Sequence, residues 1–284
     1  MLIAERPTGA PSAPSLMARA ETENFPVASR LLPRSTRHHL FAVYGFARLA
    51  DELGDSLEGD RLAALDWLEA ELDRAFAGTA EHPLLVRLTP TLHACALPRE
   101  PFVRLIEANR LDQRVARYET WEQLRGYCTL SADPVGELVL GIFGVASPAR
   151  IALSDSICTA LQLVEHCQDV AEDARRGRVY LPAEDLERFA VQESELGQAH
   201  AGRPLRELLA FEAERASGLL SAGAPLIDEL RGRERVAVAA FVAGGRAALE
   251  RAAFDVLAGP PRATRLRRLR WLAATLRERR GSSR

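Results

Sequence analysis

Residues 160–182 read ALQLVEHCQDVAEDARRGRVYLP, and four polar or acidic side chains recur in this segment three, four and four residues apart: Gln162, Glu165, Asp169 and Asp173. Because an α-helix turns once about every 3.6 residues, this spacing places all four on one helical face. Carboxylates four residues apart on a helix repel each other and destabilise it. We therefore expect a cation to neutralise this face.

The atoms on this face indicate which cation it would bind. Carboxylate oxygens are hard ligands, which on a helix suit Mg²⁺ better than Zn²⁺. The residues that follow carry guanidinium groups, which suit an anion such as phosphate: Arg175, Arg176 and Arg178. Carboxylates, a hard metal ion and arginines together predict a diphosphate held to the protein through Mg²⁺.

A second segment, YGFARLADELGD at residues 44–55, has the same design. Its polar side chains are spaced four, three and four residues apart and share one helical face: Tyr44, Arg48, Asp51 and Asp55. Either acidic face alone is typical of a solvated surface with salt bridges. Two such faces on separate helices of an apolar chain favour a shared metal site instead.

These two acidic motifs resemble those of one enzyme family. DELGD at residues 51–55, QDVAED at 168–173 and RGRVYLP at 176–182 are similar to motifs of the squalene/phytoene synthases, which join prenyl diphosphates head to head. The resemblance runs from about residue 23 to at least residue 254. ENFPVASRLLP at 23–33 and YCTLSADPVG at 127–136 resemble more specifically the hopanoid-pathway branch, the hydroxysqualene synthases.

The resemblance implies roles for individual residues. The metal ligands would be Asp51, Asp55, Glu165, Asp169 and Asp173, with Mg²⁺ as the cofactor and no NADPH. The residues that bind the diphosphate or the rest of the substrate would be Phe25, Ser29, Arg48, Gln162, Arg176 and Arg178. The catalytic groups that orient the reacting atoms would be Tyr44, Tyr127 and Tyr180. Glu165 departs from the pattern, since the family usually has Asn at this position.

Apolar residues recur at helical spacing along most of the chain, and no strand-like alternation persists. The chain is therefore predicted to be all-α. Helices are expected over residues 36–53, 60–77, 83–96, 99–117, 121–144, 148–174, 203–220, 226–243 and 245–257. Pro134 is expected to kink the fifth of these, because proline removes a backbone donor and clashes with the preceding turn.

The domain organisation follows from length and from the resemblance. A chain of 284 residues with 47% hydrophobic and 27% charged residues is ordinary for a globular protein. The resemblance implies a single-domain isoprenoid synthase fold with a central cavity over residues 23–261. Residues 1–22, rich in Pro, Ala, Ser and Thr, are expected to form a mobile leader. Residues 262–284 are expected to form a basic amphipathic helix and tail.

That tail allows two interpretations. It holds nine arginines and one acid, Glu278, with leucines and Trp271 between them. A basic amphipathic helix with Trp is typical of a membrane surface, which predicts peripheral membrane contact. A helix docked on the domain explains the same residues. Nucleic acid is not expected as a partner, since the whole chain has a formal net charge of -2.

The four cysteines lack CxxC spacing and are expected to be free thiols in a reducing compartment: Cys95, Cys128, Cys158 and Cys167. No signal peptide and no run of about 20 apolar residues is present. These features predict a cytoplasmic protein, peripheral at the inner face of the membrane if the tail binds lipid.

The activity implied by the resemblance is that of a hydroxysqualene synthase, which converts presqualene diphosphate and water to hydroxysqualene and diphosphate. The prenyl diphosphate would be its substrate, and neighbouring hopanoid-pathway enzymes would be its protein partners. Within the family the alternatives are squalene, presqualene diphosphate or phytoene synthase. A protein of another class, a non-catalytic binding protein with this fold, is a third hypothesis. The crowded carboxylates argue against it, because a scaffold gains nothing from them.

Overall fold

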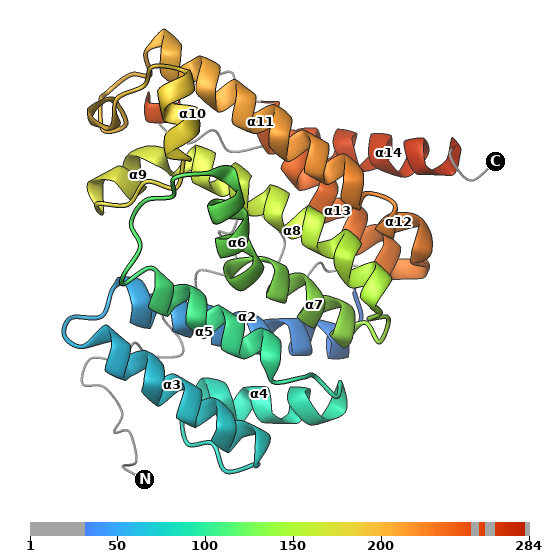
Figure 1. The fold of residues 1–284 in the computed structure, drawn as a ribbon. Helices are drawn as coiled ribbons and strands as arrows, with labels where there is room; N and C mark the ends of the chain where they lie inside the picture. The colour runs from blue at the N-terminus through green and yellow to red at the C-terminus, as the bar shows by residue number, and fades with distance from the viewer. Residues whose placement is uncertain (1–31, 251–255, 259–264, 282–284) are drawn as a thin grey trace. The chain divides into compact units, whose positions relative to one another are not determined.

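The computed structural model describes residues 32–250, 256–258 and 265–281 (Figure 1). Every regular element within these residues is helical, and one isolated bridge pairs Arg117 with Val179. The all-α prediction is therefore confirmed. The chain divides into two compact units: unit 1 comprises Met1–Arg114 and Pro134–Ala146, and unit 2 comprises Val115–Asp133 and Ser147–Arg284.

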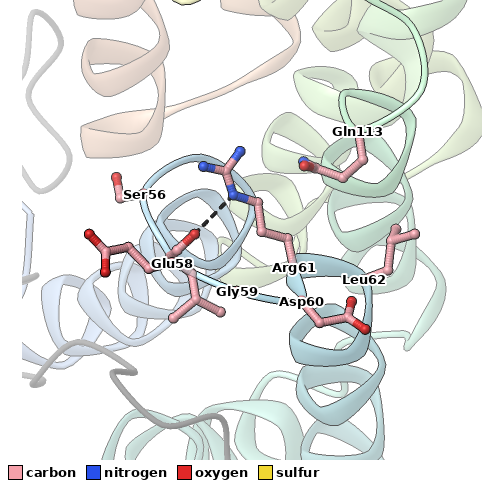
Figure 2. A pocket seen from close by; sticks show the side chains of 8 residues that line it. Ser56, Glu58, Gly59, Asp60, Arg61, Leu62 and Gln113 are labelled. Atoms are coloured by element: carbon pink, nitrogen blue, oxygen red, sulfur yellow. Dashed lines mark hydrogen bonds between the residues drawn. The ribbon is translucent and has the colours of Figure 1, made fainter.

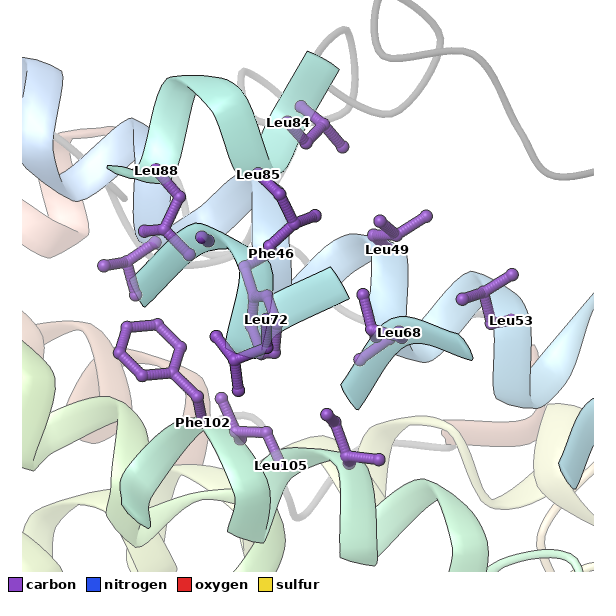
Figure 3. Packing of buried hydrophobic residues seen from close by; sticks show 14 of the residues in the cluster. Phe46, Leu49, Leu53, Leu68, Leu72, Leu84, Leu85, Leu88, Phe102 and Leu105 are labelled. Atoms are coloured by element: carbon purple, nitrogen blue, oxygen red, sulfur yellow. The ribbon is translucent and has the colours of Figure 1, made fainter. Parts of the chain in front are cut away.

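Unit 1 consists of α2 (Arg34–Asp55), α3 (Arg61–Phe76), α4 (Pro83–Ala94), α5 (Glu100–Leu111) and nearly all of α7 (Asp133–Ile142). Its core is a cluster of leucines around two phenylalanines, drawn in Figure 3. The rings of Phe46 on α2 and Phe102 on α5 meet edge to face, with centroids 5.0 Å apart. Each fully buried Leu or Phe contributes roughly 1.5–3 kcal/mol. The apolar face of α2 is thus held in the core, which leaves its acidic face outside it.

Unit 2 consists of α6 (Trp121–Ser131), α8 (Pro148–Gln168), α9 (Val170–Arg175), α10 (Ala183–Arg188), η2 (Glu193–Glu195), α11 (Arg203–Gly223), α12 (Leu226–Glu229), α13 (Gly232–Leu249), η3 (Val256–Ala258) and α14 (Arg265–Gly281). The two long helices α8 and α11 pack along each other, and α13 packs on both. Helix α14 lies against α13 (Figure 1). Helix α8, which carries the first part of the second acidic motif, therefore lies at the centre of this unit, and α9 continues from its end.

Several helix boundaries differ from the predictions. The helix expected over 121–144 is two helices separated at Ala132, two residues before Pro134. The helix expected over 148–174 is interrupted at Asp169. The helix expected to end near Arg117 ends at Leu111. In each case the predicted helix exists but is shorter or divided.

The predicted division between residues 243 and 245 is wrong. Helix α13 runs through the Gly244–Gly245 pair, and the actual break lies at Leu230 and Arg231. A Cβ atom added to Gly245 would lie 2.8 Å from Leu161 Cδ2 and 3.0 Å from Leu220 Cδ1. This glycine therefore serves close packing of α13 on α8 and α11 and does not end a helix.

The four cysteines are free thiols, as predicted. In the described part of the chain no helix is long and apolar enough to cross a membrane. The leader predicted over residues 1–22 lies outside the described residues.

The contact between α11 and α8 makes a testable prediction at Gly223. A Cβ atom there would lie 2.6 Å from the backbone oxygen of Leu153 and 2.6 Å from Ile157 Cγ1. Because a backbone atom of a packed helix cannot move aside cheaply, Gly223→Ala should destabilise the protein by about 1–3 kcal/mol. Gly218 on the same helix has open space around it, so Gly218→Ala is the matched control and should be neutral or stabilising. Thermal melts of the two variants measure the difference, and equal melting temperatures would contradict the packing.

Candidate active site

The first acidic motif lies on α2 in unit 1. Asp51 keeps 46% of its side-chain surface exposed and lies 3.5 Å from an Arg48 nitrogen. The protein around it still limits hydration of its charge. Burial raises the pKa of Asp51 to about 6, the negative charges of Asp55 and Asp112 add to this, and Arg48 opposes it. The fold therefore disfavours the ionised form of Asp51, and a cation bound here would stabilise it.

Asn109 on α5 is also part of this site, although it belongs to neither acidic motif. Its side chain is buried, and Nδ2 donates to Asp51 Oδ1 at 3.4 Å and to the Leu105 carbonyl at 3.1 Å. Gln113 Nε2 donates to the carbonyls of Gly54 at 2.9 Å and of Asn109 at 3.0 Å. These contacts hold the end of α2 on α5, so Asn109 orients the Asp51 carboxylate.

Gly54 leaves the space that Asn109 occupies. A Cβ atom on Gly54 would lie 2.2 Å from Asn109 Oδ1, so Gly54→Ala must displace the asparagine and its hydrogen bond to Asp51. Loss of a group that orients a metal ligand typically costs about 10–100-fold in metal affinity or activity, and we expect a loss in that range. The measurement is Mg²⁺ dependence of turnover, with Gly126→Ala on α6, where space is open, as the control. An unchanged Mg²⁺ requirement in Gly54→Ala would contradict this role of Asn109.

The second acidic motif spans the junction of α8 and α9 in unit 2. Asp169 lies between the two helices, with φ -100° and ψ 10°. The helical hydrogen-bond pattern continues across the junction, because Asp169 N donates to Glu165 O at 2.9 Å and Asp173 N donates to Asp169 O at 2.8 Å. The predicted succession of side chains on one face is therefore kept despite the interruption.

The carboxylates of this motif are also poorly stabilised as anions. Burial raises the pKa of Asp173 to about 7, with a further upward contribution from Asp169, while Arg176 and Arg178 oppose the shift. Burial raises the pKa of Asp169 in the same direction, and Glu172 adds to it. Both motifs thus hold acids whose ionised form would be favoured by a bound cation.

The arginines predicted to bind diphosphate differ in their surroundings. Arg176 is half exposed and pairs with Glu172 at 2.6 Å. The backbone nitrogen of Arg178 donates to Asp173 O at 2.9 Å, which keeps this arginine next to the motif. Arg48 pairs at 3.5 and 3.9 Å with Asp51 and Glu52. Arg48 and Arg176 thus each have a carboxylate partner in this structure.

Four rings gather beside the second motif. Tyr180 stacks on His166 with ring centroids 4.0 Å apart, and its centroid lies 5.5 Å from that of Tyr127 and 5.9 Å from that of Tyr118. All four side chains are buried. The pKa of His166 is lowered by burial to about 3, so this ring is neutral and can stack without the cost of a buried charge.

The sequence predicted only part of this ring cluster. Tyr127 and Tyr180 were predicted as catalytic groups, and the structure brings them together. Tyr118 was missed, because it belongs to a short segment with no helical pattern. His166 was not among the predicted site residues, and it is a core residue whose Nε2 lies 3.3 Å from Gln162 Nε2. Gln162 thereby contacts the same ring cluster.

A small cavity joins the charged and aromatic parts of this site. Its volume is about 10 Å³, and its lining includes His166, Asp173, Arg178 and Tyr180. A cavity of this size has room for about one water molecule, so a prenyl chain needs additional space. The observation shows that an acid, an arginine and two stacked rings share one recess within unit 2.

Unit 1 has a larger hollow of about 620 Å³ just beyond the first motif, lined by residues 56–62 and Gln113 (Figure 2). Five of its eight lining residues are polar or charged, and Arg61 Nε donates to the Leu57 carbonyl at 3.0 Å. Only Leu57 and Leu62 contribute apolar side chains there. The hollow thus places charged groups and apolar surface together next to the first motif.

The other predicted site residues are placed as follows. Tyr44 lies on α2 and is partly buried, as are Glu165 and Gln162 on α8. Phe25 and Ser29 lie outside the described residues. The motif on α2 belongs to unit 1 and the motif on α8 and α9 to unit 2, so the expected meeting of the two acidic faces and the central cavity stay predictions.

The carboxylate oxygens of the two motifs fit Mg²⁺ as partial ligand sets that other ligands would complete. Among the described residues no three His, Cys, Asp or Glu side chains form a preassembled metal cage. Mg²⁺ is usually held by only one or two carboxylates, and substrate phosphates and water complete its octahedral shell. Two pairs of aspartates four residues apart, Asp51 with Asp55 and Asp169 with Asp173, match that requirement, and the pKa values of Asp51, Asp169 and Asp173 are raised.

Comparison with known proteins finds relatives along most of the chain. The family model for squalene/phytoene synthase matches residues 18–273, which run through both units. A hydroxysqualene synthase of Rhodopseudomonas palustris is 37% identical over 214 residues, covering 74% of this chain and 72% of the relative. A phytoene synthase of Arthrospira platensis is 34% identical and covers 68% of each chain.

A solved structure extends the comparison to the fold. The crystal structure of squalene synthase HpnC from Alicyclobacillus acidocaldarius superposes with a TM-score of 0.77, at 46% identity, and covers 84% of this chain and 90% of that one. The isoprenoid synthase fold implied by the sequence resemblance is therefore confirmed. The chain belongs to the squalene/phytoene synthase family, whose members are enzymes that process prenyl diphosphates.

Proposed function

We propose that this protein is a Mg²⁺-dependent hydroxysqualene synthase that converts presqualene diphosphate and water to hydroxysqualene and diphosphate. The observation that carries the proposal is the recess in unit 2, where Asp173 and Arg178 lie beside the stacked rings of His166 and Tyr180. The charged end suits a leaving diphosphate, and the ring faces suit the carbocation that its departure creates.

The division of labour among the residues follows from their chemistry. Asp51, Asp55, Asp169 and Asp173, with Glu165, would hold Mg²⁺, which when bound supplies charge that stabilises the departing diphosphate. Arg48, Arg176 and Arg178 would bind the diphosphate oxygens as guanidinium donors.

The bond between the substrate carbon and the diphosphate oxygen breaks, and its electron pair leaves with the diphosphate. The π faces of Tyr127 and Tyr180 would then stabilise the rearranging cation. One water adds to the cation, and the protonated alcohol passes its extra proton to the departed diphosphate, which leaves the neutral alcohol. The apolar surroundings must admit this water at a single position, since uncontrolled water would give other alcohols. No reductant enters this balance, so NADPH is not part of the proposal.

The choice of branch rests on the relatives. Hydroxysqualene synthases and an HpnC squalene synthase are among the similar proteins. Phytoene synthases of comparable identity are also among them, so phytoene synthase activity has to be tested directly. The segments ENFPVAS and SADPVG favour the hydroxysqualene branch.

The deciding experiment supplies the purified protein and Mg²⁺ with presqualene, farnesyl or geranylgeranyl diphosphate, each in water enriched in ¹⁸O. We expect presqualene diphosphate to give hydroxysqualene that carries the label, as read by mass spectrometry. Phytoene from geranylgeranyl diphosphate, or presqualene diphosphate as the end product from farnesyl diphosphate, would assign one of the other synthase activities. No turnover of any substrate by folded protein would favour a binding role.

A further inference from the structure

The arginine-rich helix α14 has one face docked on unit 2. Arg246 on α13 donates to Thr275 Oγ1 at 3.1 Å and to Glu278 Oε2 at 2.7 Å, and its guanidinium lies 5.7 Å from the centre of the Trp271 ring. Arg279 pairs with Asp228. The indole of Trp271 is therefore used in docking, although the sequence had suggested it for a membrane surface.

The opposite face of α14 is exposed and carries two leucines. Leu266 is 81% exposed and Leu269 is 60% exposed. Arg270, with 73% of its side chain exposed, Ala273 and Arg277 complete this face at helical spacing. These five residues are called the outer face of α14 below.

Two exposed leucines less than a turn apart are unusual in this molecule. The described residues include only two other exposed large hydrophobic side chains, Val86 and Val135, at 49% and 38%. Single exposed apolar residues are normal on protein surfaces, but a pair flanked by arginines suits a specific partner. Glu250, at the end of α13, pairs with Arg270 at 2.8 Å, and Arg270 still keeps 73% of its side chain exposed.

We propose that the outer face of α14 binds the surface of an anionic lipid bilayer. Leu266 and Leu269 would insert between the lipid headgroups, where their side chains leave water. Arg270 and Arg277 would contact lipid phosphates, since guanidinium groups pair with phosphate and are attracted by the negative surface potential. The docked face keeps α14 attached to α13, so insertion does not require the helix to leave the protein.

Charge and area favour lipid over other occupants. A second copy placed with its outer face against this one would bring four arginines together and bury two leucines per chain, well short of the roughly 800 Å² per partner of a stable interface. Nucleic acid would engage the arginines but leave the leucines in water. A bilayer satisfies both groups at once.

The test uses the full-length protein and flotation with vesicles of phosphatidylcholine, with and without phosphatidylglycerol. Wild type should float only with the anionic vesicles, and less as salt is raised. Leu266→Ser with Leu269→Ser should lower the bound fraction about tenfold, because each loses apolar area that the lipid would cover. Arg270→Gln with Arg277→Gln should lower it mainly at low salt.

Matched controls separate this face from general surface effects. Val86→Ser removes an exposed apolar side chain on α4, and Arg203→Gln removes an arginine on α11 that is 84% exposed. Both should float like wild type. The leucine variant and both controls should melt like wild type, whereas the arginine variant also loses the ion pair between Arg270 and Glu250 and should melt slightly lower. Flotation of the leucine variant at the wild-type level would overturn the proposal. So would a dimer, detected by sedimentation, that depends on the two leucines, or tight binding to DNA in place of vesicles.

Discussion

Asp173→Asn and Asp51→Asn should each lower kcat by about 100-fold or more while the protein stays folded. Each change removes a charged ligand of the proposed Mg²⁺, and a metal contributes several kcal/mol of stabilisation to a developing charge, at about 1.36 kcal/mol per tenfold in rate. Turnover of presqualene diphosphate across a Mg²⁺ titration measures the loss, and circular dichroism reports the fold.

Neighbouring acids provide matched controls for these variants. Glu172→Gln on α9 and Glu52→Gln on α2 remove the same charge from residues that are not proposed ligands. Both should keep activity within a few-fold of wild type, as expected for surface ion pairs. Activity losses equal to those of the aspartate variants would show that general charge, and not the proposed metal site, is responsible.

Without Mg²⁺, the Asp173→Asn variant should also differ from wild type in how its stability depends on pH. The folded pKa of Asp173 is about 7, above its ordinary value of 3.8, so the native state holds this proton over a range in which the unfolded chain has released it. The contribution of Asp173 to the free energy of unfolding is therefore largest below about pH 4 and falls as pH rises toward 7. Asp173→Asn should lose that fall, so its melting temperature should exceed that of wild type most at pH 8. A constant difference at all pH values would contradict the raised pKa.

Arg215→Met should destabilise the folded protein more than any of the changes in the two acidic motifs. Arg215 on α11 donates to Asp185 Oδ2 at 2.9 Å and to both oxygens of Glu212 at 2.8 and 2.7 Å, and these two carboxylates are buried. Removing one partner of a buried ion pair leaves an uncompensated charge and typically costs about 3–5 kcal/mol. Denaturant unfolding should show a loss of this size.

Two comparisons test the reason for that loss. Arg203→Met on the same helix removes an exposed arginine paired with Glu207 and should leave the unfolding midpoint nearly unchanged. Burial raises the pKa of Glu212 to about 7, so protonation relieves the Arg215→Met variant as pH falls from about 8 to about 5, and its deficit should shrink over that range. A deficit that does not change with pH would point to lost packing against Trp121 and Phe211, whose rings the guanidinium covers at 4.7 Å.

The features of the fold and site that could be predicted from the sequence are those that depend on residues close together in the chain. Helical periodicity depends on residues three and four apart, so the all-α class and most helices could be derived without any knowledge of packing. The same spacing placed the acids of each motif on one face, and hard oxygen ligands beside arginines indicated a metal and a diphosphate. Even where the structure interrupts the second motif at Asp169, the hydrogen bonds between residues four apart continue.

Tertiary structure decided the features that depend on distant residues. Asn109 meets Asp51 across 58 positions of sequence, and Tyr118 joins Tyr180 from a segment with no pattern of its own. Gly245 looked like a helix end, yet it lies inside α13 because neighbouring helices leave no room for a side chain. The sequence of α14 is compatible with docking and with an exposed surface, and only its contacts with α13 show which of its residues form the docked face and which the outer face. In each case the sequence determined which chemical groups are available, while packing between helices, which sequence spacing does not encode, determined which of them meet.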